Sequence, residues 1–139
     1  MVSVEWKGGM AFEALPPSGN RFVMDAIPES GGDNQGPTPV EALCASVAAC
    51  SAMDVILILQ KKKQHVTAYR IEVEWTRGPE GVYPRPITSM VVRHVVKGNN
   101  LDAAALARAV ELSDTKYCSV IATLRSGPAV TSEYRIESE

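Results

Sequence analysis

The sequence has no feature that would send the chain out of the cell or attach it to nucleic acid. Its N-terminus, MVSVEWKGG, lacks a basic segment followed by an apolar one, so we expect no signal peptide. Fourteen basic and sixteen acidic residues give a net charge of −2, without the basic surface that attracts nucleic acid or an anionic membrane. Three cysteines are too few for a disulfide framework. These absences predict a cytoplasmic protein without structural disulfides.

Long apolar runs are also scarce, and the longest one, residues 40–59, only approaches the length of a membrane span. It contains Glu41 and Asp54, and about half of it consists of small residues instead of leucine. We therefore expect a helix buried in protein and no transmembrane segment. The chain lacks internal repeats and low-complexity tracts, and its length suits a single domain over residues 1–139.

A capping box marks the start of this apolar helix. Thr38 stands at the N-cap, Pro39 at the first helical position and Glu41 at the third, an arrangement typical of a helix N-terminus. The predicted helix continues to about residue 63, which makes it roughly 39 Å long, more than a domain of this size is comfortably wide. Its apolar residues go most of the way round the axis. We therefore expect a second subunit to help cover it.

Alternating apolar and polar residues predict β-strands on both sides of the long helix. The segment 27–37 is rich in Gly, Pro, Asp and Asn and predicts a loop. The element order βββ-α-ββ-αα-β is that of an α+β protein in which the helices are segregated from an antiparallel sheet. Strands are expected at residues 2–6, 10–14, 21–25, 69–75, 87–96 and 130–136, and two shorter helices at 101–110 and 115–124.

Cys50 and Cys118 are the candidate reactive residues. Cys50 lies near the middle of the long helix among alanine and serine, which leaves room beside its sulfur. A free cysteine is more often a buried packing residue, so residue type alone favours packing. Cys118 is expected near the N-terminal turn of a helix, where the helix dipole favours a thiolate. Cys44 is about 120° round the helix from Cys50 and is expected to pack.

The charged residues near Cys50 have several possible roles. Asp54 projects on the same side of the helix as Cys50 and could hold a partner chain or a ligand, whereas Glu41 has a structural role in the capping box. A carboxylate beside a cysteine raises the thiol pKa, so activation would need a cation. The cysteine spacings match no zinc pattern, and we expect no metal site and no bound cofactor. The candidate cations are Arg21, Arg108 and Arg125.

Two stretches of the sequence together resemble a known signature. GPTPVEALCASVAACSAMDV at residues 36–55 and VELSDTKYCSV at residues 110–120 are similar to the two cysteine motifs of the OsmC/Ohr family, the osmotically inducible and organic hydroperoxide resistance proteins. The resemblance covers nearly the whole chain in element order. It implies an OsmC-like fold and an intertwined homodimer, in which sheets from both subunits enclose the long helices.

The resemblance also implies a chemistry, because family members of established activity are thiol peroxidases. Cys50 would attack the O–O bond of a hydroperoxide and become a sulfenic acid, and Cys118 would then close a disulfide with it. A small dithiol, such as a lipoyl group, would reduce this disulfide.

The chain departs from the family pattern at the two residues that activate the peroxidatic cysteine. Met10 stands where the family has an Arg, and Val40 stands where it has a Glu. Glu41 is displaced from the family position by one residue, or about 100° of helix. Arg21, on a neighbouring strand, is the candidate substitute for the missing cation.

The sequence therefore supports two functions. The first is thiol-dependent reduction of organic hydroperoxides through the Cys50/Cys118 pair. The alternative is a non-catalytic protein that binds a small hydrophobic or electrophilic ligand in a cleft at the dimer interface. The retained cysteines favour the first, and the missing Arg and Glu favour the second. A third hypothesis is a structural dimer whose cysteines only pack.

Overall fold

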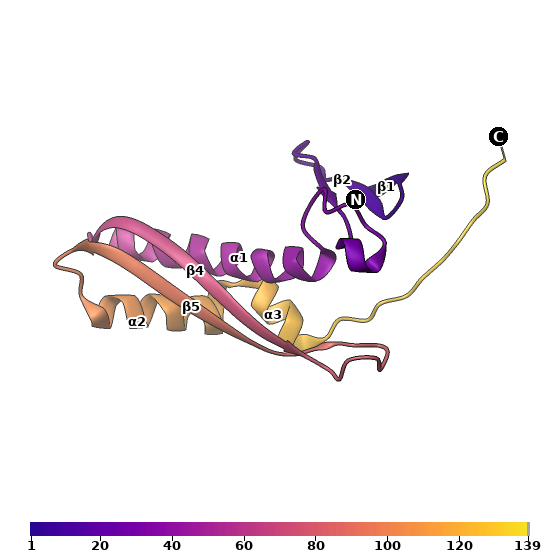
Figure 1. Ribbon diagram of the computed structural model, residues 1–139. Helices are drawn as coiled ribbons and strands as arrows, with labels where there is room; N and C mark the ends of the chain where they lie inside the picture. Colours follow the sequence, from indigo (N-terminus) through magenta and orange to yellow (C-terminus); the bar gives the residue numbers. More distant parts are fainter. Residues whose placement is uncertain (139) are drawn as a thin grey trace. The chain divides into compact units, whose positions relative to one another are not determined.

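The computed structural model describes residues 1–138 and has the mixed, antiparallel α+β composition that the sequence predicts (Figure 1). The chain forms two compact units, one made of Met1–Ala49 with Arg70–Val95, the other of Cys50–Tyr69 with the residues from Val96 onward. The elements are β1 (Ser3–Gly8), β2 (Ala11–Leu15), β3 (Phe22–Met24), the short 3-10 helix η1 (Pro28–Ser30), α1 (Pro39–Lys61), β4 (His65–Arg77), β5 (Ile87–Asn99), α2 (Ala103–Leu112), the π-helical turn η2 (Ser113–Tyr117) and α3 (Ser119–Ser126).

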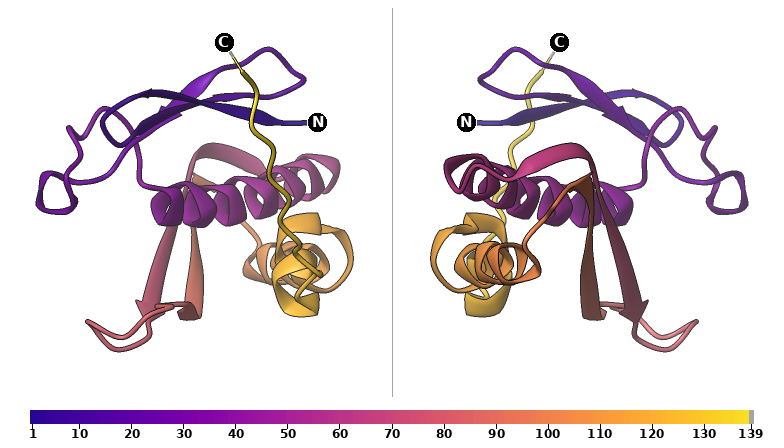
Figure 2. Two further views of the ribbon diagram at one scale, coloured as in Figure 1. Left: turned by 90° about the vertical axis from the view of Figure 1, so that its right-hand side faces the viewer. Right: turned by 90° about the vertical axis from the view of Figure 1, so that its left-hand side faces the viewer.

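The first unit begins with an antiparallel meander in the strand order β1-β2-β3, which forms one layer (Figure 2). The turn between β1 and β2 is made by Gly8 and Gly9, whose φ angles of 102° and 55° are open to glycine without strain. The indole of Trp6 donates to the Gly9 carbonyl oxygen at 2.9 Å and closes this turn. The predicted N-terminal strands are thus confirmed, with β3 shorter than expected.

Helix α1 begins with the predicted capping box. The Thr38 amide donates to Glu41 Oε1 at 2.9 Å, and the Glu41 amide donates to Thr38 Oγ1 at 3.2 Å. The helix ends at Lys61, two residues before the expected end. An 18-residue window of this 23-residue helix has a mean hydropathy of 2.2, enough for a membrane span by length and composition, and only 28% of that window is buried within one chain. The fully buried side chains follow one i, i+4 row and are Val47, Ser51, Val55 and Leu59.

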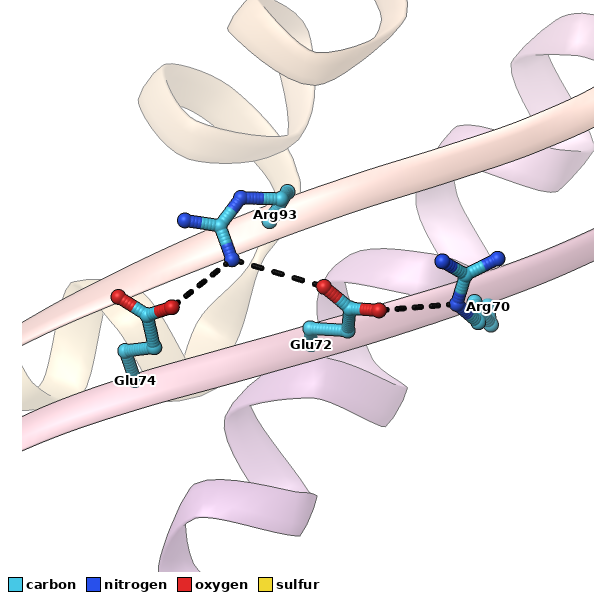
Figure 3. Close-up of polar contacts among 4 residues, drawn as sticks. All are labelled: Arg70, Glu72, Glu74 and Arg93. Atoms are coloured by element: carbon cyan, nitrogen blue, oxygen red, sulfur yellow. Dashed lines mark hydrogen bonds and ion pairs between the residues drawn. The ribbon is translucent and has the colours of Figure 1, made fainter.

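Strands β4 and β5 form a long hairpin of 13 residues each. Strand β4 is longer at both ends than the alternating pattern predicted, and β5 begins at the predicted residue but ends later. Their polar face carries a row of ion pairs (Figure 3). Arg93 reaches from β5 to Glu74 at 3.1 Å and to Glu72 at 3.5 Å, and Arg70 pairs with Glu72 at 2.9 Å. Because all four side chains are exposed, these ion pairs contribute little to the free energy of unfolding.

The second unit packs the C-terminal half of α1 against α2 (Figure 1). Val55, Leu59 and Ala109 are its buried centre. Helix α2 starts at Asp102, whose carboxylate accepts the Ala104 amide at 2.9 Å as an N-cap. Where the sequence predicted a second helix at 115–124, the chain forms the π-helical turn η2 and then α3. The partly buried side chains around this centre are Ile58, Val66, Tyr69, Val96, Leu106 and Val110.

The expected C-terminal strand at residues 130–136 is wrong for the single chain. Residues from Gly127 to Ser138 form no strand and leave α3 as an extended segment (Figure 1). Val130 and Tyr134 are almost fully exposed. Alternation of apolar and polar residues indicates which side chains share a face, but a strand also needs a neighbouring edge for its backbone hydrogen bonds.

Candidate functional site

The structure brings the two candidate cysteines together in the second unit. Cys50 lies on α1 and is half-buried, whereas Cys118 is buried and lies between η2 and α3. The side chain of Cys50 is a neighbour of Cys118 and raises the pKa of its thiol. All three cysteines of the chain are free thiols. The pair therefore stands as two neighbouring reduced sulfurs, one of them open to approach from outside.

Cys118 is the N-cap residue of α3, and its Sγ accepts the amide hydrogen of Ile121 at 3.5 Å. Burial raises the pKa of the Cys118 thiol, and the neighbouring Cys50 side chain raises it further, while the amides of Ile121 and Val120 act in the opposite direction. The helix N-terminus favours the thiolate, as expected, but the net shift of the Cys118 pKa is upward. The N-terminal amides do act on the sulfur, but burial outweighs them.

No positive charge is among the groups that shift the pKa of Cys118 in the part of the chain that the structure describes. Two of the candidate cations lie in the second unit, where Arg108 pairs with Glu111 at 2.9 Å and Arg125 donates to the Asp114 carbonyl oxygen at 2.6 Å. Arg21 lies in the first unit, 3.9 Å from Glu13. Activation of Cys50 by Arg21 stays a prediction.

A buried hydrogen-bond network that sequence reasoning missed lies next to the cysteines. Ser51, the residue after Cys50, has its Oγ 3.0 Å from the Oγ of Ser113. The Ser113 hydroxyl donates to Asp54 Oδ2 at 3.1 Å. Both serines are completely buried. Ser113 lies between the two helices predicted at 101–110 and 115–124, but its pairing with Asp54 across 59 residues was not visible in the sequence.

Asp54 is part of this network, since its carboxylate accepts a hydrogen bond from the Ser113 hydroxyl. Glu41 is engaged too, because its two bonds with Thr38 close the capping box. Hydrogen bonds from the Thr38 amide and hydroxyl hold the pKa of Glu41 below its usual value. The structural role of Glu41 is confirmed, and roles for Glu41 and Asp54 in substrate binding or activation stay predictions.

Cys44 is a packing residue of the first unit, as expected. It is buried, and burial together with the negative charge of Glu41 raises the pKa of its thiol. Burial and a raised pKa leave little of the Cys44 thiolate at neutral pH, and its burial keeps substrates away from the sulfur. Within residues 1–138, no three His, Cys, Asp or Glu side chains gather as a metal site would need.

The first unit contains a mostly apolar cleft of about 600 Å³. Met10 and Val40, which are expected from the sequence to stand in place of the family Arg and Glu, both line it. Two charged residues, Asp25 and Arg77, contribute to its wall. These two side chains contribute to the apolar wall of the cleft.

Asp25 organises the loop beside the cleft and was not singled out from the sequence. Its carboxylate accepts the amides of Ala26 at 2.7 Å, Gln35 at 3.1 Å and Asp33 at 3.2 Å. Burial opposes its charge, but these three bonds outweigh burial and lower the pKa of Asp25. The segment 27–37, which the sequence predicted to be a loop, is thus held by hydrogen bonds to the Asp25 carboxylate.

The chain is similar to known proteins over most of its length. The sequence profile described as OsmC-like protein matches residues 32–133. The Escherichia coli protein YhfA is 36% identical over 133 residues, which cover 96% of this chain and 95% of YhfA. A crystal structure of a hypothetical protein from Aquifex aeolicus is 29% identical, covers 91% of this chain and 87% of its own, and superposes with a TM-score of 0.74.

More distant structures share the fold alone. An organic hydroperoxide resistance protein from Vibrio cholerae is 14% identical, with coverage of 88% of this chain and 83% of its own and a TM-score of 0.63. Identity this low says nothing about the residues of a site, so the similarity is limited to the arrangement of helices and strands.

Proposed function

Because this chain belongs to the OsmC-like protein family, we propose that it is a thiol-based redox protein that reduces organic hydroperoxides through Cys50 and Cys118. The observation that carries the proposal is the proximity of the two sulfurs in the second unit. Cys50 is the more accessible of the two and therefore the one that a substrate can reach. Cys118, buried behind it, is the resolving thiol.

The reaction balances with these two residues. The Cys50 thiolate attacks one peroxide oxygen, the O–O bond breaks, and the alcohol leaves with a proton while Cys50 becomes a sulfenic acid. The Cys118 thiolate then attacks the Cys50 sulfur and displaces water after protonation, which leaves a Cys50–Cys118 disulfide. A small dithiol, for which a lipoyl group is a candidate, restores both thiols by exchange. The proposed compartment is the cytoplasm, because thiols are kept reduced there.

The functional form in this proposal is a homodimer. Met53 and Leu57 on α1 are 68% and 50% exposed in the single chain, an unusual state for the central helix of a small domain. The extended residues after Gly127 also expose Val130, Tyr134 and Ile136. A second copy that covers α1 and adds an edge for the C-terminal segment would bury both surfaces.

Thiol titration before and after addition of cumene hydroperoxide tests the redox function. We expect loss of two of the three free thiols per chain, with formation of an intramolecular disulfide. Cys50→Ser abolishes peroxide consumption, and Cys118→Ser stops the reaction at the sulfenic acid. Cys44→Ser is the matched control and behaves like wild type. Peroxide consumption no faster than that of Cys50→Ser rules the proposal out.

The apolar cleft of the first unit favours a second candidate function, binding of a small apolar ligand without turnover. With Met10 and Val40 in its wall, the cleft accepts an aliphatic chain, and Arg77 offers a cation for an acidic head group. Decanoate is a suitable probe. If this function holds, decanoate raises the melting temperature of wild type and of Cys50→Ser equally, and Val40→Asp removes the shift, because only binding to the folded state stabilises it.

A further inference from the structure

Ser113 connects the two cysteine-bearing elements of the second unit through two different groups. Its side chain bonds to α1, where Ser51 Oγ is 3.0 Å and Asp54 Oδ2 is 3.1 Å away. Its carbonyl oxygen accepts the amide of Cys118 at 2.9 Å, the hydrogen bond that closes the π-helical turn η2. One residue therefore fixes the backbone of Cys118 relative to the helix turn that carries Cys50.

The chemistry of the three side chains decides which group donates and which accepts each hydrogen bond of this network. An ionised carboxylate only accepts hydrogen bonds, so the Ser113 hydroxyl donates to Asp54. The Ser113 oxygen then accepts the Ser51 hydroxyl. Because both serines are completely buried, water does not replace either bond when it breaks.

The location of this network is the reason to assign it more than a packing role. Ser51 directly follows Cys50, and Asp54 is one helical turn further on the same side of α1. A π-helical turn is rare and is found mostly where function requires it. Here it sets the path of the chain into Cys118, whose own sulfur caps α3.

We propose that Ser113 is a positioning residue for disulfide formation, which holds the Cys118 sulfur against Cys50 through Ser51 and Asp54. This inference rests on the proposed redox role of the two cysteines. It adds that the effective concentration of Cys118 at the Cys50 sulfur depends on a hydroxyl that touches neither. Loss of that hydroxyl leaves both thiols present but lets η2 move away from α1.

Equilibration with a glutathione redox buffer tests positioning without any peroxide. The Cys50 thiolate attacks oxidised glutathione, forms a mixed disulfide and releases one reduced glutathione. The Cys118 thiolate then attacks the Cys50 sulfur and releases the second, so the protein is oxidised by two electrons and glutathione is reduced. The ratio of intramolecular disulfide to mixed disulfide, measured by mass spectrometry after acid quenching, gives the effective concentration of Cys118.

For Ser113→Ala we expect the effective concentration to fall about tenfold, as loss of one to two hydrogen bonds implies. This fall corresponds to a rise of ~30 mV in the reduction potential of the pair. Asp54→Ala, which removes the acceptor of the same hydroxyl, should give a similar rise if Ser113→Ala does not fold. Asp54→Asn keeps an acceptor and should recover most of the wild-type potential.

Two control variants separate positioning from general destabilisation. Ser46→Ala removes a hydroxyl from the exposed side of α1, where it bonds only to the Ala42 carbonyl oxygen, and should leave the potential unchanged. Val55→Ala removes buried volume from the same unit and should lower the melting temperature without changing the potential. A wild-type potential in folded Ser113→Ala or Asp54→Ala overturns the inference. Inactivity towards hydroperoxides, with the potential shift present, overturns only the proposed peroxidase function.

Discussion

The buried serine pair predicts a measurable energetic coupling between two residues that are 62 positions apart in the sequence. Ser51→Ala removes a neutral hydrogen bond to Ser113, and its direct cost is about 1 kcal/mol. Ser113→Ala removes the same bond and also the bond to the Asp54 carboxylate, which as a bond to a charged group is worth about 1.5–3 kcal/mol. The expected loss in the free energy of unfolding is therefore ~2–4 kcal/mol for Ser113→Ala.

The two losses share one bond, so the double variant should cost less than their sum. The shared term is the neutral bond at 3.0 Å, and we expect a coupling energy of about 1 kcal/mol. Urea unfolding of wild type, both single variants and the double variant measures it, with reducing agent present and one protein concentration throughout, since association changes apparent stability.

Additivity is the result that would refute this reasoning. Distant and independent sites add within about 0.3–0.5 kcal/mol, so a cycle that closes within that range means that the two hydroxyls do not interact. Any other contact that Ser51 makes cancels in the cycle, because it is lost equally with and without the Ser113 hydroxyl. A pair of Ser46→Ala and Ser113→Ala is the matched negative control, since Ser46 bonds only within the first turns of α1.

Three further predictions follow from the exposed helix face, the capping box and the buried thiols. Leu57→Glu should prevent dimer formation in sedimentation velocity, because a charge replaces apolar surface on α1, whereas Gln60→Glu on the same helix should not; wild-type protein that is monomeric at every concentration contradicts this. Thr38→Ala should cost about 1 kcal/mol in urea unfolding, because the cap of α1 is lost, and Thr38→Ser should restore most of it. The stability that the buried thiols contribute should be full below the ordinary cysteine pKa of about 8.5 and should fall as pH rises above it. The reason is that Cys118 and Cys44 have raised pKa values, so they keep their protons to higher pH in the folded state than in the unfolded state. A urea midpoint that is constant between pH 7.5 and 9.5 contradicts this prediction.

Local signals in the sequence predicted the parts of the fold that depend on neighbouring residues. The start of α1 follows from Thr38, Pro39 and Glu41 alone, because a capping box is completed within four positions. The alternation in β4 and β5 predicted the strands but not their length, since strand ends are set by the partner strand. The C-terminal segment was predicted as a strand and forms none, because alternation without a paired edge does not make a strand.

The candidate site was predictable in its reactive residues and not in their surroundings. Cys50 and Cys118 could be chosen from the motifs, and the structure places them side by side. Ser113 could not, because its role depends on a contact with Asp54 across 59 positions of sequence. The effect of the helix N-terminus on Cys118 was predictable but the net upward shift of its pKa was not, since the sequence does not show how deeply the thiol is buried.

The burial of Cys118 also assigns the two thiols to different steps. Attack on a hydroperoxide requires a sulfur that solvent and substrate can reach, and of the pair only Cys50 is open to approach from outside. Closing the disulfide requires a Cys118 thiolate, and the raised pKa keeps its population small at neutral pH. Under the proposed function, the closing step therefore depends on the small fraction of Cys118 that is ionised, and the sulfenic acid of Cys50 has time to react with a second peroxide and become sulfinic. Tight positioning by Ser113 compensates for the scarce thiolate, because a high effective concentration raises the closing rate without any change in pKa.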